Sequence, residues 1–129
     1  MANSVRGESE VVLGGTTYTL RMTFASMEMI EEQTKTGLMP LLRSFMTNSF
    51  KATDIAVVIW ACVNVVLREE KKTPLDLGWV GERLMEAGFK NYSGVVSEFL
   101  FRALAGPKIE ASLTVDESGA SAVISEQGK

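Results

Sequence analysis

The residues that could do chemistry in this chain are few, and the common catalytic and metal-binding combinations are missing. The 129 residues include no histidine and a single cysteine, Cys62. Without histidine, Ser-His and Cys-His nucleophile pairs cannot form, and zinc sites of the usual His and Cys composition are impossible. Because Cys62 lies inside an apolar run, we interpret it as a small core residue rather than a reactive thiol.

The densest carboxylates, Glu28, Glu31 and Glu32, stand at the spacing of neighbours on one helix face. Paired carboxylates can transfer protons or hold a metal ion. No DxDxDG loop, ExxH motif, GxGxxG loop or GxxxxGK[ST] loop accompanies them. We therefore interpret them as a solvated face, and we predict that the protein is not an enzyme and uses no cofactor and no metal.

The composition excludes several other classes of protein. The net charge is −3, from 13 basic and 16 acidic residues, so no basic excess marks a nucleic-acid surface. Hydrophobic residues make up 46% of the chain, a globular value. The polar start, Met1–Glu10, is not a secretory signal. We expect a soluble cytoplasmic protein that binds neither nucleic acid nor membrane.

The run from Ile55 to Leu67 is interrupted only by Asn64. It is too short to span a bilayer, which needs about 20 apolar residues. As a helix it is apolar all round and must be buried on every side. It is either the central post of a helical domain or partly covered by another chain. Asn64, if buried, needs hydrogen-bond partners and could fix a helix register or a subunit interface; alternatively it lies on the least covered side.

The segment Glu8–Thr23 predicts a β-hairpin around the turn Gly14-Gly15. With that turn as the loop, Val11 faces Tyr18 on an apolar face that also carries Leu13 and Leu20. The opposite face pairs Val12 with Thr17 and ends in the charged pair Glu8 and Arg21. An isolated hairpin is marginal, so it must pack on helices or join another chain's sheet.

Helical periodicity and capping residues divide the rest of the chain. The first predicted helix runs from a Thr23 cap to a stop at Gly37, and the second covers Leu38–Met46 with Pro40 in its first turn. The third runs from Thr53-Asp54 to about Arg68, and the fourth from a cap at Thr73 or Asp76 to about Ala87. The fifth runs from an Asn91 cap to a stop at Gly106-Pro107. The predicted fold class is α+β and mostly helical, with the N-terminal hairpin packed on four to five helices.

The composition changes after this hairpin plus helical domain (residues 1–106). Residues 107–129 are rich in Ser, Gly, Ala and acids, and we predict a flexible acidic tail. Within it, Ile109–Val115 alternates apolar and polar residues with period two. That piece is either disordered or able to pair as a strand where a partner offers an edge.

The order of parts resembles the small tail assembly chaperones of long-tailed phages, in the branch shared with gene transfer agents and labelled phage tail tube proteins. Four stretches carry the resemblance over about residues 4–105: MANSVRGESEVVLGG with TYTLRMTF, MEMIEEQTKTG with LMPLL, DIAVVIWACV, and TPLDLGWVGERLMEAG. They are patterns of size and polarity, and the family has no catalytic residues to carry over.

The resemblance implies a role in tail morphogenesis. Such proteins, encoded by phages and prophages, are expected to coat the tape measure protein, keep it soluble and recruit tail tube subunits. They act as homo-oligomers in the bacterial cytoplasm and are absent from the mature particle. The main alternative is a structural tail tube or connector subunit of the virion. A small enzyme using carboxylates and lysine, or a helical DNA-binding regulator, finds less support in the residues.

Two surfaces are predicted for these contacts. Methionines cluster between Met22 and Met46, and pliable Met surfaces suit partner helices, although filling core gaps also explains them and fits Met27. The predicted partner-binding residues are Met29, Met39, Leu42, Phe45 and Met46. The predicted self-association residues, at the hairpin, are Val11, Val12, Tyr18 and Leu20.

Overall fold

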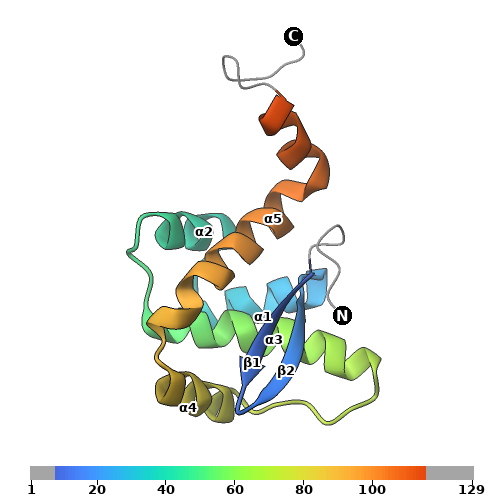
Figure 1. Cartoon of the computed structure of the whole chain (residues 1–129), viewed down its shortest axis with the longest axis vertical. Coiled ribbons are helices and arrows are strands. Elements are labelled where there is room, and N and C mark those ends of the chain that lie inside the picture. Colours follow the sequence, from blue (N-terminus) through green and yellow to red (C-terminus); the bar gives the residue numbers. More distant parts are fainter. Residues whose placement is uncertain (1–7, 116–129) are drawn as a thin grey trace.

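Two strands are followed by five helices in the computed structural model, which describes residues 8–115 and the side chains of residues 8–105 (Figure 1). The strands are β1 (Glu8–Leu13) and β2 (Thr16–Arg21). The helices are α1 (Phe24–Thr34), α2 (Leu38–Met46), α3 (Ala52–Glu69), α4 (Leu77–Ala87) and α5 (Lys90–Val115). This arrangement confirms the predicted fold class of a hairpin packed on helices.

The hairpin has the predicted register throughout, from Leu13 opposite Thr16 to Glu8 opposite Arg21. Gly14 and Gly15 have φ of +58° and +84°, the left-handed conformations that a tight two-residue hairpin turn requires. Val11, Leu13 and Leu20 are buried, as the alternation predicted. The turn therefore fixes which face of the hairpin enters the core.

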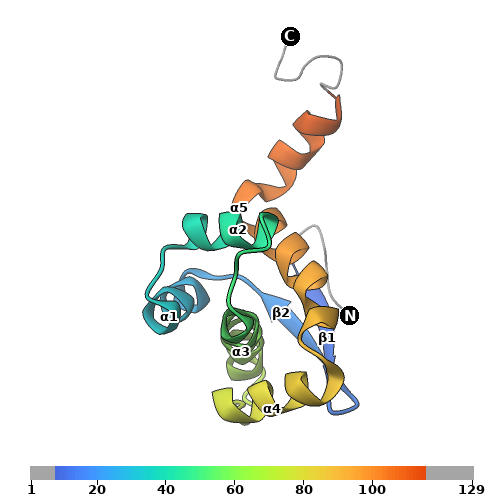
Figure 2. The ribbon, with the colours of Figure 1, turned by 90° about the vertical axis from the view of Figure 1, so that its left-hand side faces the viewer.

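Helix α3 is the centre of the molecule. It packs against α1, β2, α4 and α5, and Figure 2 looks almost along it, with α1 on one side, the hairpin on the other and α4 below. From Ile55 to Leu67 every residue except Trp60 is buried. The chain's own elements thus cover the apolar run, which supports the central-post interpretation.

Several helix ends lie where the sequence placed them. Thr23 caps α1, its Oγ1 accepting the Ser26 N–H at 3.1 Å. Of the two caps considered for α4, Asp76 is the correct one, because its Oδ2 accepts the Trp79 N–H at 3.2 Å. Gly88, at φ +94°, ends α4.

Two predicted caps are wrong. Helix α1 stops at Thr34 because Lys35 adopts the left-handed conformation (φ 59°), and Gly37 instead precedes α2 as its N-cap. The carboxylate of Glu31 accepts the Leu38 N–H at 2.9 Å, so this acid joins α1 to α2 rather than only facing solvent. Asn91 lies inside α5 and donates to the Ala87 carbonyl at 2.7 Å instead of capping the helix.

Helix α5 continues to Val115, beyond the Gly106-Pro107 stop that the sequence predicted. Proline removes one backbone N–H and bends a helix that runs through it, and the ribbon of α5 changes direction before its end (Figure 1). Ile109–Val115 is described as helix rather than strand. The division between domain and tail stays a prediction, and residues 1–7 and 116–129 lie outside the described part of the chain.

Candidate functional site

The outer face of α2 carries two of the predicted partner-binding residues. Met39 is 58% exposed and Met46 is 61% exposed, and exposed Arg43 lies between them. The spacing i, i+4, i+7 puts the three side chains on one side of the helix. We call Met39, Arg43 and Met46 the α2 face.

Leu42 and Phe45, also predicted at this surface, are buried, with exposures of 7% and 4%. The Phe45 ring stacks on Phe50 at 4.5 Å between ring centres, and α2 packs against α5 and α1. Both residues turn toward the elements that α2 packs on, although Leu42 lies next to Met39 and Met46 around the helix. They hold the helix in place and are not accessible to a partner in this conformation.

Met29 is half-buried and packs against the core, as Met22 and Met27 do. The expectation that it projects freely into solvent is therefore not met. The Met29 side chain leaves α1 in a different direction from that of Ile30, as helical geometry requires. Neighbouring elements nevertheless cover the Met29 side chain in part. The α2 face is consequently narrower than the surface predicted from the methionine cluster.

The predicted self-association residues separate into two groups. Val11 and Leu20 belong to the core, whereas Val12 is 52% exposed and Tyr18 is half-buried. The Val12 carbonyl accepts the hydroxyl of Tyr92 in α5 at 2.9 Å. Any contact between copies at the hairpin must therefore use Val12, Tyr18 or the strand backbone.

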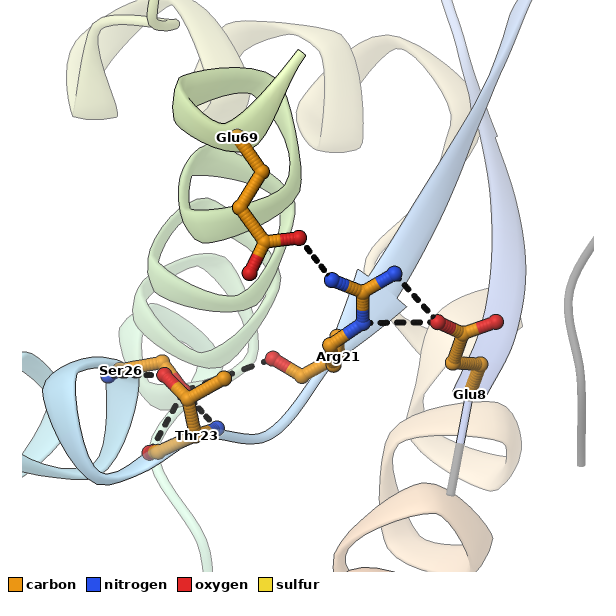
Figure 3. Close-up of polar contacts among 5 residues, drawn as sticks. All are labelled: Glu8, Arg21, Thr23, Ser26 and Glu69. Atoms are coloured by element: carbon orange, nitrogen blue, oxygen red, sulfur yellow. Dashed lines mark hydrogen bonds and ion pairs between the residues drawn. The ribbon is translucent and has the colours of Figure 1, made fainter. Parts of the chain in front are cut away.

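A polar cluster ties the hairpin to the end of α3 (Figure 3). The Arg21 guanidinium donates to Glu8 at 2.7 Å and also pairs with Glu69. The hydrogen bond with Glu8, and with smaller effect the one with Glu69, raises the pKa of Arg21 against the opposing effect of burial. Beside it, Ser26 and Thr23 exchange hydrogen bonds at the start of α1. The arrangement joins β1, β2 and α3 by charge.

Asn64 has the partners that its burial demanded. Its side chain donates to the Leu75 carbonyl at 3.0 Å and accepts the Leu75 N–H at 2.8 Å. Trp60 donates its indole N–H to the same carbonyl at 3.1 Å. The two side chains hold the connection between α3 and α4 against α3, so Asn64 serves the chain's own fold rather than a subunit interface or an uncovered side.

Phe24 is an exposed residue that the sequence analysis missed. It is 73% exposed and borders a shallow groove with Val65, Arg68 and Glu69. The available signal was its place directly after the Thr23 cap, since the first helical residue often lies outside the packed stripe. Trp79 is half-buried beneath the Arg83 guanidinium, 5.1 Å from the ring centre.

The described residues hold little chemical equipment. Burial raises the pKa of the Cys62 thiol to about 12, although a hydrogen bond with Ser26 lowers it in part. Within residues 8–115, no cluster of three or more acidic or cysteine side chains is placed to hold a metal ion. In the same range no helix combines the length and the apolar character needed to cross a membrane. The arrangement offers surfaces for contact between proteins.

Comparison with known proteins gives a match at the level of the family. Residues 6–106 match the model of a family described as "Phage tail tube protein, GTA-gp10". No curated protein and no solved structure matches the chain significantly. The matched range contains the hairpin, α1 to α4 and the part of α5 that packs on them. The chain therefore belongs to the GTA-gp10 family of phage tail proteins, in the clan of tail assembly chaperones.

Proposed function

We propose that this protein is a tail assembly chaperone that binds the tape measure protein and recruits tail tube subunits during tail morphogenesis. The observation that carries the proposal is the α2 face, where Met39 and Met46 are 58% and 61% exposed although α2 itself is firmly packed. Family membership supports a role in tail assembly. The choice of the tape measure protein as partner is our proposal.

The chemistry of the α2 face fits an amphipathic partner helix. Methionine side chains are flexible and adapt to partners of varied shape, and apolar helix faces are read at i, i+3, i+4 and i+7. Burying one large apolar side chain contributes roughly 1.5–3 kcal/mol, so two methionines bind weakly on their own. Many copies on one long partner bind firmly through multivalency and still release one at a time.

The test is co-expression of the chain with the tape measure protein encoded by the same phage or gene transfer agent. The double substitution Met39→Glu with Met46→Glu places charge in the proposed contact, and we expect recovery of the soluble complex to fall at least about tenfold. A loss of 1.4 kcal/mol already corresponds to a factor of ten. Met85→Glu is the matched control, because Met85 is 67% exposed but lies on α4.

Unchanged complex formation by the double variant would show that the α2 face is not the binding surface. A chain that ignores the tape measure protein altogether would sink the chaperone proposal itself. Circular dichroism of each variant checks that the fold is intact. Since both methionines point away from the core, we expect no loss of helix signal.

We further propose that copies associate through the hairpin, with Val12 and Tyr18 as its accessible side chains. Light scattering of the purified chain measures its mass in solution. A defined oligomer supports this part of the proposal, and a monomer at every concentration contradicts it. The proposal also places the protein in the bacterial cytoplasm and not in the finished particle.

A structural subunit of the tail tube is the second candidate, because the family's own description names a tail tube protein. A tube subunit would be retained in the virion, and the two-stranded sheet of residues 8–115 is small for that role. Mass spectrometry of purified particles separates the candidates. Detection of the chain in stoichiometric amount favours the tube subunit over the chaperone.

A further inference from the structure

Among the described residues, the outer edge of β2 is open between Thr16 and Leu20, whereas the Arg21 carbonyl at its end accepts the Ser26 hydroxyl at 3.4 Å. In a two-residue hairpin the residues that flank the turn form a hydrogen-bonded pair, so Leu13 bonds with Thr16 and the pattern alternates from there. The backbone N–H and C=O groups of Thr17 and Thr19 consequently point away from β1. In the described residues the sheet has no third strand.

A groove accompanies this edge. Thr16–Thr19 form one side of it, and the second half of α3 forms its floor. The floor residues Val63, Val66 and Leu67 are apolar and at most 7% exposed, so only their edges face the groove. Glu70 and Lys72 stand at the rim as an ion pair with 3.2 Å between their charged atoms. A strand laid beside β2 would turn alternate side chains onto this apolar floor.

The β2 edge lacks the features that normally prevent strand addition. Charged residues, prolines and covering elements protect sheet edges, yet Thr16–Leu20 contains neither a charge nor a proline. The β1 edge differs, because Tyr92 occupies the Val12 carbonyl and Glu8 and Glu10 lie along that strand. Both strands end in a charged residue, Glu8 and Arg21, and the β2 edge differs from the β1 edge by its uncharged stretch Thr16–Leu20.

The chain itself contains a segment suited to this groove. Ile109–Val115 alternates apolar and polar residues with period two, which gives a strand one apolar face but gives a helix no apolar stripe. It follows Gly106 and Pro107, which disfavour helix, and it carries a single charge, Glu110. Both ribbon views show the end of α5 projecting from the body (Figures 1 and 2).

We propose that Ile109–Val115 of one copy leaves its helix and adds to the β2 edge of a neighbouring copy as a third strand. Its apolar residues cover Val63, Val66 and Leu67, and its backbone pairs with Thr17 and Thr19. The donor and acceptor surfaces are different, so the contact is head-to-tail and builds a ring or an open spiral. The inference rests on the self-association part of the proposed function and not on tape measure binding.

A disulfide trap with full-length chains tests the contact directly. One chain carries Thr17→Cys, and the other carries either Ser112→Cys or Thr114→Cys on the polar face of the donor segment. Directly opposed residues of paired strands lie within disulfide reach. Native Cys62 is buried and does not compete. We expect one of the two mixtures to give a cross-linked dimer several-fold above the control mixture of Thr17→Cys with Met85→Cys.

The mass of the protein in solution provides a second test of the inference. Leu113→Asp puts a charge on the apolar face of the donor strand and should lower the average mass to that of the monomer, whereas Thr114→Asp puts the same charge on the solvent face and should not. On the acceptor side, Thr19→Pro removes an edge N–H, and Thr19→Val keeps it. If the Thr19→Pro variant fails to fold, the variants of the donor segment still test the inference.

The inference is overturned if neither cysteine mixture exceeds its control while the chain is oligomeric, or if Leu113→Asp leaves the mass unchanged. Either result would rule out strand addition to β2 but would still allow copies to associate through another part of the hairpin. The strand-addition inference and the proposed self-association can therefore fail separately. A chain that carries both cysteines could also form the disulfide within itself. If that disulfide forms at a rate independent of concentration, the donor segment does not come from a neighbouring copy, and the inference is overturned. A chain that is monomeric at every concentration overturns both proposals.

Discussion

Asn64 is the only polar residue of α3 between Ile55 and Leu67, and its side-chain amide bonds with both the carbonyl and the N–H of Leu75. Asn64→Leu keeps the volume similar but leaves the Leu75 N–H without that acceptor. We expect the free energy of unfolding to fall by roughly 1–3 kcal/mol, measured by urea denaturation. Trp60→Phe should cost less, because the Leu75 carbonyl keeps the Asn64 donor; an equal loss would contradict the assignment.

Cys62 makes stability depend on alkaline pH. Its pKa rises from 9.0 to about 12 in the folded chain, so between those values only the unfolded chain loses the proton. The contribution is fully present below pH 9 and is lost as pH rises toward 12. At pH 10 the loss is on the order of 1 kcal/mol.

Cys62→Ala removes this titration, and its stability should therefore fall less than that of the native chain between pH 8 and pH 10. Denaturant unfolding at the two pH values measures the difference. All other residues are the same in the two proteins, so the comparison isolates Cys62. Parallel curves for the two proteins would mean that the thiol is not protected by burial.

At the residue scale, the sequence specified what had to be buried but not which groups would meet. The apolar run required that Asn64 find partners, yet nothing in its neighbours pointed to Leu75, since a loop brings that backbone across α3. Likewise Leu42 and Phe45 were grouped with Met39 by type. That Leu42 and Phe45 are buried while Met39 is exposed depends on the elements that α2 packs on.

At the scale of elements, the turn of the hairpin sets the register of both strands. Gly14 has φ +58°, and a Cβ there would lie 3.3 Å from Cδ of Arg83. Gly14→Val should destabilise the chain by roughly 1–2 kcal/mol, while Gly14→Asn should be nearly neutral because asparagine suits this turn position. Both variants add the same Cβ, so a thermal melt that shows equal losses would assign the cost to Arg83 rather than to the backbone.

Element boundaries followed the sequence wherever a local hydrogen bond determines them. Thr23 and Asp76 cap their helices through bonds within four residues, and α2 spans the predicted Leu38–Met46. The misplaced cap at Gly37 involves a longer-range contact. Glu31 reaches from α1 to the start of α2, and this contact shifts the role of Gly37 from a stop to a start.

At the scale of the whole molecule, one well-packed body carries two different exposed features. We propose that the α2 face binds a partner helix and that the β2 edge pairs with a strand. Helix α2 packs on α1 and α5, whereas β2 packs on α3. A substitution in one feature should therefore leave the other intact, as the proposed chaperone function requires.

The end of α5 connects these functions, and Pro107 controls it. Proline in a helix interior costs about 3 kcal/mol relative to alanine, so Pro107→Ala should stabilise the helical form of Ile109–Val115 and increase the helix signal in circular dichroism. If the same segment must leave its helix to join a neighbour, the more stable helix opposes exchange. The yield of the Thr17→Cys cross-link should then fall although the β2 groove is unaltered. A higher helix signal with an undiminished cross-link would mean that the donor segment binds as a helix, and the strand-exchange inference would be wrong.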